Sequence, residues 1–147
     1  MIYESEEPFF EEKGRVTDQQ EIGGNRSQSM FSAEGTLKGN IEVINKGDFV
    51  SISKGNKVTH AQGQGVIMTK DGTEKASYTF LAVGSIIEEG KPVFRGSAVY
   101  STDSTGRLAF LNNILSFFQV EIDAAGNFKH RARIEMMIFI FFHLVVL

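Results

Sequence analysis

Short runs of apolar or alternating residues, separated by Gly, Asn and Asp, make up most of the chain from Arg15 onward. The intervals between turns, roughly 8 to 12 residues, are typical of all-β sandwiches and barrels. No stretch before residue 107 keeps the 3.6-residue apolar period of an amphipathic helix. The pattern predicts strands at residues 15–22, 28–37, 40–45, 48–53, 57–69, 74–87, 93–101, 107–111, 115–122 and from 128 onward.

Two turns between predicted strands are clearly marked, the Asp-Gly pair at 71–72 and the Glu-Gly pair at 89–90. Such pairs tolerate the positive φ values of a two-residue type I′ hairpin turn. Partners in an antiparallel hairpin share a face, so a turn at 71–72 pairs Gly65 with Tyr78. The Tyr78 ring is then expected to cover Gly65, as aromatic rings cover strand glycines in curved sheets.

Extending this register through the second turn assigns two faces to three strands. One face carries Gly65, Ile67, Tyr78, Phe80, Arg95 and Val99, and the other carries His60, Gln62, Gln64, Leu81, Phe94 and Tyr100. Both faces are substantially apolar, whereas a sheet with one solvated side alternates apolar and polar residues. Each face must therefore be covered. A barrel whose outside meets a partner subunit would do this, and so would a barrel or sandwich with a further layer.

The stretch GQGVIMTKDGTEKASYTFLAVGS, followed by FRGSAVYSTDSTGRLAFLNN, resembles the barrels of the allene oxide cyclase and dirigent type. The upstream FSAEGTLKGNIEV is similar in kind, and the resemblance covers roughly residues 32–127. It implies an all-β fold, a calycin-like antiparallel β-barrel of about eight strands with a small central cavity. The matching positions are glycines, turns and apolar residues, so the resemblance carries no catalytic residue across.

Three regions are predicted from composition. Residues 1–13 contain five glutamates and read as an acidic, poorly ordered leader. Residues 14–135 form the barrel, and residues 136–147 form an apolar tail. The leader lacks the basic and apolar segments of a secretory signal, which favours a cytoplasmic location.

The tail MMIFIFFHLVVL has a single polar side chain, His143. As a helix it would rise only ~18 Å, short of the ~30 Å hydrocarbon core of a bilayer. As a strand it would reach ~40 Å, longer than an ordinary strand. We therefore expect a segment appended to the barrel, which either contacts an interface or partner or arises from an altered reading frame. Membrane contact through the tail is the less favoured expectation.

Charge and composition narrow the chemistry. The formal net charge of -3 argues against a nucleic-acid surface, which needs clustered Lys and Arg. The chain has no cysteine, and its histidines at 60, 130 and 143 lie in separate segments. This spacing predicts no metal site. No phosphate-binding loop, nucleophile elbow or zinc-protease motif occurs, so we expect no cofactor.

One strand face carries the best polar constellation for a small-molecule site. His60, Gln62 and Gln64 share this face with Tyr100, and apolar Leu81 and Phe94 complete the candidate lining. A mostly apolar wall with a few convergent polar groups is typical of ligand pockets. The competing interpretation, which is slightly favoured, is that His60, Gln62 and Gln64 face water on the outside of the barrel. If the other face of these strands lines the cavity, Tyr78 and Arg95 point into it. A buried Arg would then suggest an anionic ligand.

Three functions follow from these features. The first, which we favour, is a barrel that binds a small apolar or aromatic ligand. The second is an isomerase or cyclase that holds a hydrophobic substrate in a dry cavity, with Tyr100, His60 or Arg95 as acid, base or anion-stabilising group. The third is a membrane-associated or structural protein that acts through its tail. The sequence names no ligand or substrate.

Overall fold

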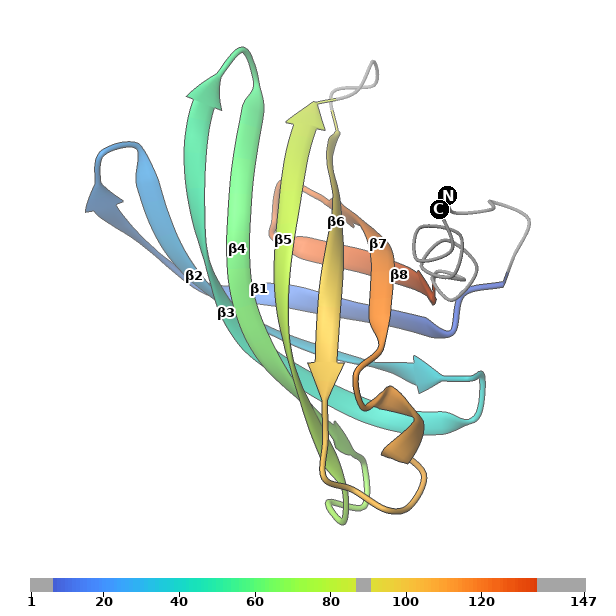
Figure 1. Ribbon diagram of the computed structural model, residues 1–147. Helices are drawn as coiled ribbons and strands as arrows, with labels where there is room; N and C mark the ends of the chain where they lie inside the picture. The colour runs from blue at the N-terminus through green and yellow to red at the C-terminus, as the bar shows by residue number, and fades with distance from the viewer. Residues whose placement is uncertain (1–6, 87–90, 135–147) are drawn as a thin grey trace, which may run out of the picture.

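The computed structural model describes residues 7–86 and 91–134, which form a closed barrel of eight antiparallel strands (Figure 1). Each strand pairs with the next, and the last pairs with the first, so the predicted all-β barrel is confirmed. The elements are β1 (Phe10–Gly23), β2 (Arg26–Leu37), β3 (Ile41–Gly55), β4 (Val58–Thr69), β5 (Lys75–Ile86), β6 (Pro92–Ser101), the 3-10 helix η1 (Ala109–Leu111), β7 (Leu115–Ile122) and β8 (Asn127–Ile134).

Three predicted boundaries were wrong. The segments at 40–45 and 48–53 form one strand, β3, because Gly47 is not a turn. A Cβ there would collide with the β4 backbone and with the Phe31 ring, so this glycine permits close approach. Residues 109–111 form η1 and not a strand. β1 begins at Phe10, within the predicted leader, because Phe10 is buried in the barrel. The apolar tail lies outside the described residues.

The register of β4 and β5 matches the prediction, and the expected cover of Gly65 by Tyr78 is confirmed. The turn itself differs from type I′, because of the two central residues only Gly72 has a positive φ. The predicted register of β5 and β6 was wrong by one residue. The prediction placed Tyr78 on the same face as Arg95 and Val99, whereas in the structure Tyr78 pairs with Tyr100. An odd number of residues, 87–91, separates the paired Ile86 and Pro92, and the predicted turn at 89–90 lies outside the described residues.

One end of the barrel is closed by a tightly packed apolar core. Leu108 and Leu111, from the segment that contains η1, are fully buried there. They pack with buried side chains from the surrounding strands, namely Phe10, Leu37, Ile41, Val43, Ile67 and Ala76. This plug fixes one end of the barrel interior.

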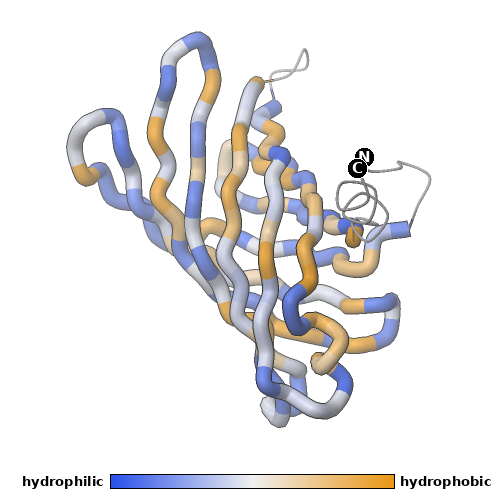
Figure 2. The backbone as a smooth tube through the Cα atoms, viewed as in Figure 1, coloured by the Kyte–Doolittle hydropathy of each residue, from blue (hydrophilic) through white to orange (hydrophobic). Residues whose placement is uncertain are grey.

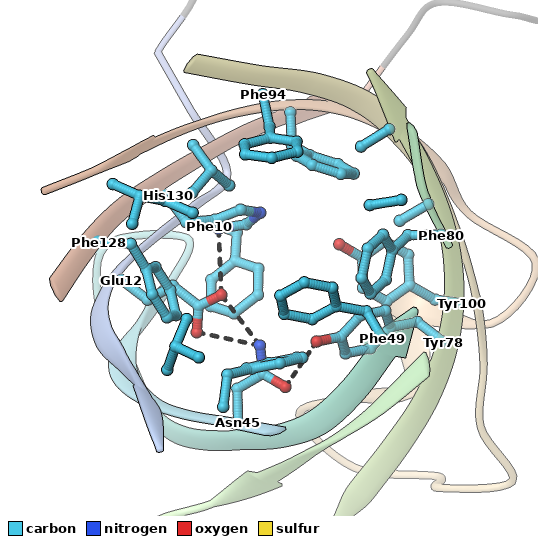
Figure 3. A pocket seen from close by; sticks show the side chains of 18 residues that line it. Phe10, Glu12, Asn45, Phe49, Tyr78, Phe80, Phe94, Tyr100, Phe128 and His130 are labelled. Carbon is cyan, nitrogen blue, oxygen red and sulfur yellow. Dashed lines mark hydrogen bonds and ion pairs between the residues drawn. The ribbon is translucent and has the colours of Figure 1, made fainter. Parts of the chain in front are cut away.

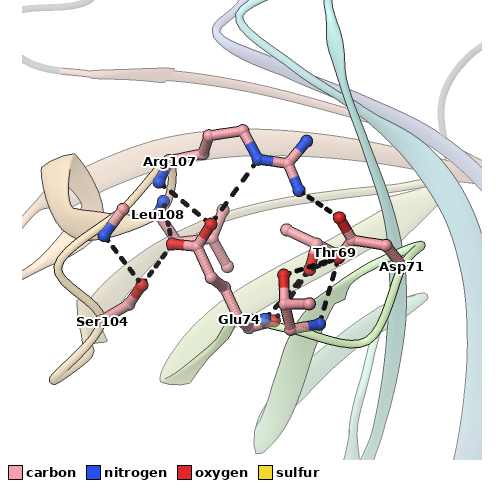
Figure 4. Close-up of polar contacts among 8 residues, drawn as sticks. Thr69, Asp71, Glu74, Ser104, Arg107 and Leu108 are labelled. Carbon is pink, nitrogen blue, oxygen red and sulfur yellow. Dashed lines mark hydrogen bonds and ion pairs between the residues drawn. The ribbon is translucent and has the colours of Figure 1, made fainter.

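A polar clasp ties the plug to the β4–β5 hairpin (Figure 4). The Glu74 carboxylate accepts hydrogen bonds from the Ser104 hydroxyl and from the backbone N–H groups of Arg107 and Leu108, the latter two at 3.0 Å. The Arg107 guanidinium also lies 2.7 Å from the Asp71 carboxylate. Because these contacts join residues 30 or more positions apart in the sequence, they hold the loop before η1 against the barrel end.

The outer surface carries several large apolar side chains, and Figure 2 shows hydrophobic stretches along the strands. Leu81 on β5 is 62% exposed, and Val83 on β5 and Val99 on β6 are each 51% exposed. The described residues include no helix that is both long and apolar enough to traverse a bilayer.

Candidate functional site

A cavity of about 90 Å³ lies inside the barrel (Figure 3). All strands contribute to its wall, and most of the lining is apolar or aromatic. The lining residues are Phe10, Glu12, Val16, Phe31, Asn45, Phe49, Ala61, Tyr78, Phe80, Ala82, Phe94, Ala98, Tyr100, Phe118, Val120, Ile122, Phe128 and His130. An engineered dry cavity of ~150 Å³ binds benzene. The present cavity is smaller, so a six-membered ring would require the lining side chains to move apart slightly.

Aromatic rings in mutual contact form a belt around the cavity. Phe31 contacts both Phe128 and Phe49, with ring centroids 6.1 and 6.2 Å apart. The belt continues from Phe49 through Phe80 to Phe118, at 6.3 and 5.9 Å. Such spacings are those of favourable tilted and edge-to-face pairs. The belt therefore offers ring faces and edges to an apolar ligand.

A chain of hydrogen bonds crosses the wall between the aromatic rings. The Tyr78 hydroxyl donates to Asn45 Oδ1 at 2.8 Å, and Asn45 Nδ2 donates to both Glu12 oxygens at 3.0 and 3.1 Å. These residues stand on β5, β3 and β1, each with another strand in between. Gly65 and Gly35 occupy the intervening strands, and a Cβ on either would collide with Tyr78 or Glu12. The two glycines therefore allow the polar side chains to meet.

Glu12 also faces His130, its partner in the β1–β8 ladder. His130 Nδ1 lies 3.1 Å from Glu12 Oε2, but an N–H on this nitrogen would not point at the oxygen, and Nδ1 has no hydrogen-bond partner as a donor. The lone pair of an unprotonated Nδ1 has the same direction as that N–H, so a proton on the carboxyl would not form a hydrogen bond here either. Because an ion pair at this distance would be hydrogen-bonded, the contact is better described as the packing of two neutral groups.

The electrostatics of this pair agree with that description. Burial raises the pKa of Glu12 from 4.5 to about 8, and the Asn45 hydrogen bond lowers it only in part. Burial also lowers the pKa of His130 from 6.5 to about 4. Removal from water penalises the charged form of each group. Near pH 7 the cavity wall therefore carries a protonated carboxyl and a neutral imidazole.

Tyr100 supplies a second hydroxyl to the same cavity. It is 2% exposed, and burial raises its pKa, with the nearby Glu12 carboxylate raising it further. The phenol thus stays protonated. Its oxygen accepts a hydrogen bond from the Ser116 hydroxyl at 3.3 Å. Among the described residues no acceptor for the Tyr100 O–H is seen, so this donor is open to a ligand.

The cavity approaches the surface at the end opposite the η1 plug. A surface hollow there shares four lining residues with the cavity: Val16, Phe49, Phe94 and Ile122. The rim of the hollow carries polar side chains from several strands, including Ser29, Ser51, Thr59 and Asp123. The hollow therefore lies between solvent and the aromatic belt at this end of the barrel.

The predicted site residues separate onto two faces. Phe94, Tyr100 and Tyr78 line the cavity. His60, Gln62, Gln64 and Leu81 lie exposed on the outer surface, and so does Arg95. Neither of the two predicted sets of lining residues is therefore found complete, because the β5–β6 register differs by one residue from the predicted one. With Arg95 outside, no guanidinium from residues 7–86 or 91–134 lines the cavity to attract an anion.

Three polar residues of the cavity were not predicted: Glu12, Asn45 and His130. A signal for one of them exists in NFKHRAR, where Phe128, His130 and Ala132 alternate with charged residues and so mark the inner face of β8. Glu12 was assigned to the leader because of its glutamate neighbours. Asn45 was assigned to the end of a strand that in fact continues. No group of three or more His, Asp or Glu residues within the described ranges could hold a metal ion.

Comparison with protein-family models and with curated proteins gives no match. The solved structures that share the fold include two proteins of unknown function. A conserved protein of unknown function from Rhodopseudomonas palustris has a TM-score of 0.67 and 15% identity, covering 86% of this chain and 95% of its own. A protein with unknown function from Clostridium acetobutylicum has a TM-score of 0.68 and 15% identity, covering 88% and 98%. The chain thus has an eight-stranded barrel similar to those of two uncharacterised bacterial proteins.

Proposed function

We propose that this protein binds a small, uncharged and largely apolar molecule inside the barrel. The observation that carries the proposal is the cavity, in which a belt of phenyl rings surrounds a single polar cluster. Ligand pockets combine these features, since apolar walls supply affinity and a few polar groups fix orientation. The resemblance to barrels of the allene oxide cyclase and dirigent type supports the same function.

The charge of the cavity wall supports an uncharged ligand. Glu12 is protonated near pH 7 and His130 is neutral, as their shifted pKa values require. The tyrosine hydroxyls are neutral too. An ionised ligand would lose its hydration and find no opposite charge in this wall. A neutral molecule with one ring and one hydrogen-bonding group matches both the size and the polarity.

Filling the cavity tests the proposal. Ala98 lines the cavity, whereas its neighbour Ser97 lines a shallow hollow on the outside of the barrel. Ala98→Leu should weaken the binding of a fluorescent lipophilic probe at least about tenfold, since the added carbons occupy the space of the ligand. Ser97→Leu is the matched control and should leave binding unchanged. Binding is measured by fluorescence titration, with circular dichroism to verify the fold of both variants.

Two outcomes would contradict the binding function. One is the absence of saturable binding of any ring-sized apolar probe by the unmodified protein. The other is equal binding by Ala98→Leu and the unmodified protein, since the probe would then lie outside the barrel.

A further inference from the structure

Hydrogen bonds hold the polar cluster of Glu12, Asn45 and Tyr78 in a fixed arrangement. The Glu12 carboxyl is held by two hydrogen bonds from Asn45, and Asn45 is oriented by the Tyr78 hydroxyl. Each carboxylate oxygen has two lone pairs, and a single hydrogen bond reaches Oε1 among the described residues. One acceptor position on Oε1 is therefore open, next to the cavity that Glu12 lines.

We propose that Glu12 is a proton-transfer group that enolises a small neutral carbonyl compound held in the cavity, with the Tyr100 hydroxyl donating to the carbonyl oxygen. This rests on the proposed binding function. Figure 3 shows the side chains of Glu12, His130 and Tyr100 all directed into the same space. A carbonyl compound fits because it is neutral, accepts a hydrogen bond and carries an acidic C–H beside the carbonyl.

The reaction needs no co-reactant. The Glu12 carboxylate takes a proton from the carbon next to the carbonyl. The electron pair of that C–H bond becomes a carbon–carbon double bond, and the carbonyl oxygen gains the negative charge, which the Tyr100 O–H stabilises. The proton on Glu12 then returns to the same carbon or to a conjugated carbon two bonds away. If the Glu12 carboxyl first exchanges its proton with solvent, return to the same carbon replaces the original hydrogen by one from solvent. Return to the conjugated carbon isomerises the molecule.

His130 is a positioning residue in this scheme. Its Nδ1 lies 3.1 Å from Glu12 Oε2 without a hydrogen bond, so the buried imidazole holds the carboxyl in place by packing against it. The dry cavity strengthens the base, because burial raises the pKa of Glu12 to about 8. A base with a pKa near the working pH transfers protons most effectively.

The experiment separates binding from proton transfer. Cyclohexanone serves as a one-ring probe, with binding measured by NMR titration and enolisation by exchange of its α-hydrogens in deuterium oxide. Conversion of 3-cyclohexen-1-one to the conjugated enone, followed by ultraviolet absorbance, measures isomerisation. We expect the protein to accelerate exchange at least about 100-fold over buffer, with a rate that rises with pH and levels off above an apparent pKa near 8.

Glu12→Gln is the decisive variant, because Gln keeps the size and can accept one of the two Asn45 hydrogen bonds through its amide oxygen, but it cannot take a proton. It should lower exchange about 100-fold or more while the cyclohexanone affinity changes less than about threefold. Glu11→Gln, on the exposed side of the same strand, should retain the full rate. Tyr100→Phe should lower the rate about tenfold or more through the loss of the donor to the carbonyl oxygen.

The results distinguish two failures. Saturable cyclohexanone binding with exchange at the buffer rate would overturn the proton-transfer proposal and leave the binding function standing. A Glu12→Gln variant that exchanges as fast as the unmodified protein would overturn it as well. If neither cyclohexanone nor the fluorescent probe binds, the binding function itself is wrong.

Discussion

Glu12 is a carboxyl group whose properties are set by its place in the barrel. It is 6% exposed, whereas its neighbours Glu11 and Lys13 face solvent. A carboxylate in water would be ionised at neutral pH, but the loss of hydration in the cavity favours the protonated form. Because the unfolded chain lacks this environment, the folded and unfolded states bind different numbers of protons.

This difference predicts how stability depends on pH. Between pH 6.5 and 8 the folded state holds the Glu12 proton and the unfolded state does not, so the free energy of unfolding should fall as pH rises, by up to about 2 kcal/mol. Below pH 6.5, His130, whose pKa is lowered to about 4, produces the opposite slope and offsets the effect. Urea unfolding at a series of pH values measures the curve.

Glu12→Gln should remove the decline between pH 6.5 and 8, and Glu11→Gln should keep it. An unchanged decline in the Glu12 variant would mean that another group binds the proton.

At the scale of elements, the strand assignments depended on local patterns and the register on loop lengths. The β4–β5 register was predictable, since Asp71 and Gly72 mark the turn centre. The β5–β6 register was not, because an odd-length connection reverses which residues face inward. The same error placed Arg95 on the face of Tyr78, which lines the cavity, and it placed Tyr100 on the opposite face. A one-residue difference in one loop thus decided which residues of β6 line the site.

The clasp around Glu74 is predicted to hold the η1 plug in place. Glu74→Ala removes the acceptor for the Ser104 hydroxyl and two backbone N–H groups. It should lower the free energy of unfolding and speed hydrogen exchange at residues 105–111, because the two backbone N–H groups lose their acceptor. Chemical unfolding and exchange mass spectrometry measure the two effects.

Arg107→Ala is the control for the clasp. Its side chain is 49% exposed and paired with Asp71 and Glu74, so its loss should cost less than about 1 kcal/mol. A larger cost for Arg107→Ala than for Glu74→Ala would show that the ion pairs, and not the backbone contacts, hold the plug.

At the scale of the whole molecule, closure of the barrel depends on residues 10–134. β8 pairs with β1 on one side and with β7 on the other, so it removes both free edges of the sheet. A chain that ends after residue 135 should therefore fold into the same barrel, with a Tm within about 2 °C of the full chain. Thermal unfolding followed by circular dichroism measures this.

A chain that ends after residue 126 is the matched control, since it lacks β8 and leaves one edge of β1 and one edge of β7 unpaired. It should show no cooperative transition. If the chain ending after residue 135 also loses its transition, residues beyond the last strand are needed for closure.

The sequence alone determined the fold class, because alternation, turn residues and strand glycines are local signals that require no knowledge of contacts. It also determined the chemistry available, since a chain without cysteine or paired histidines is restricted to oxygen and nitrogen groups. The tertiary structure decided the site. Glu12, Asn45 and His130 are far apart in the sequence and meet only when the barrel closes. Their protonation depends on the loss of water in that closed interior, which no local pattern encodes.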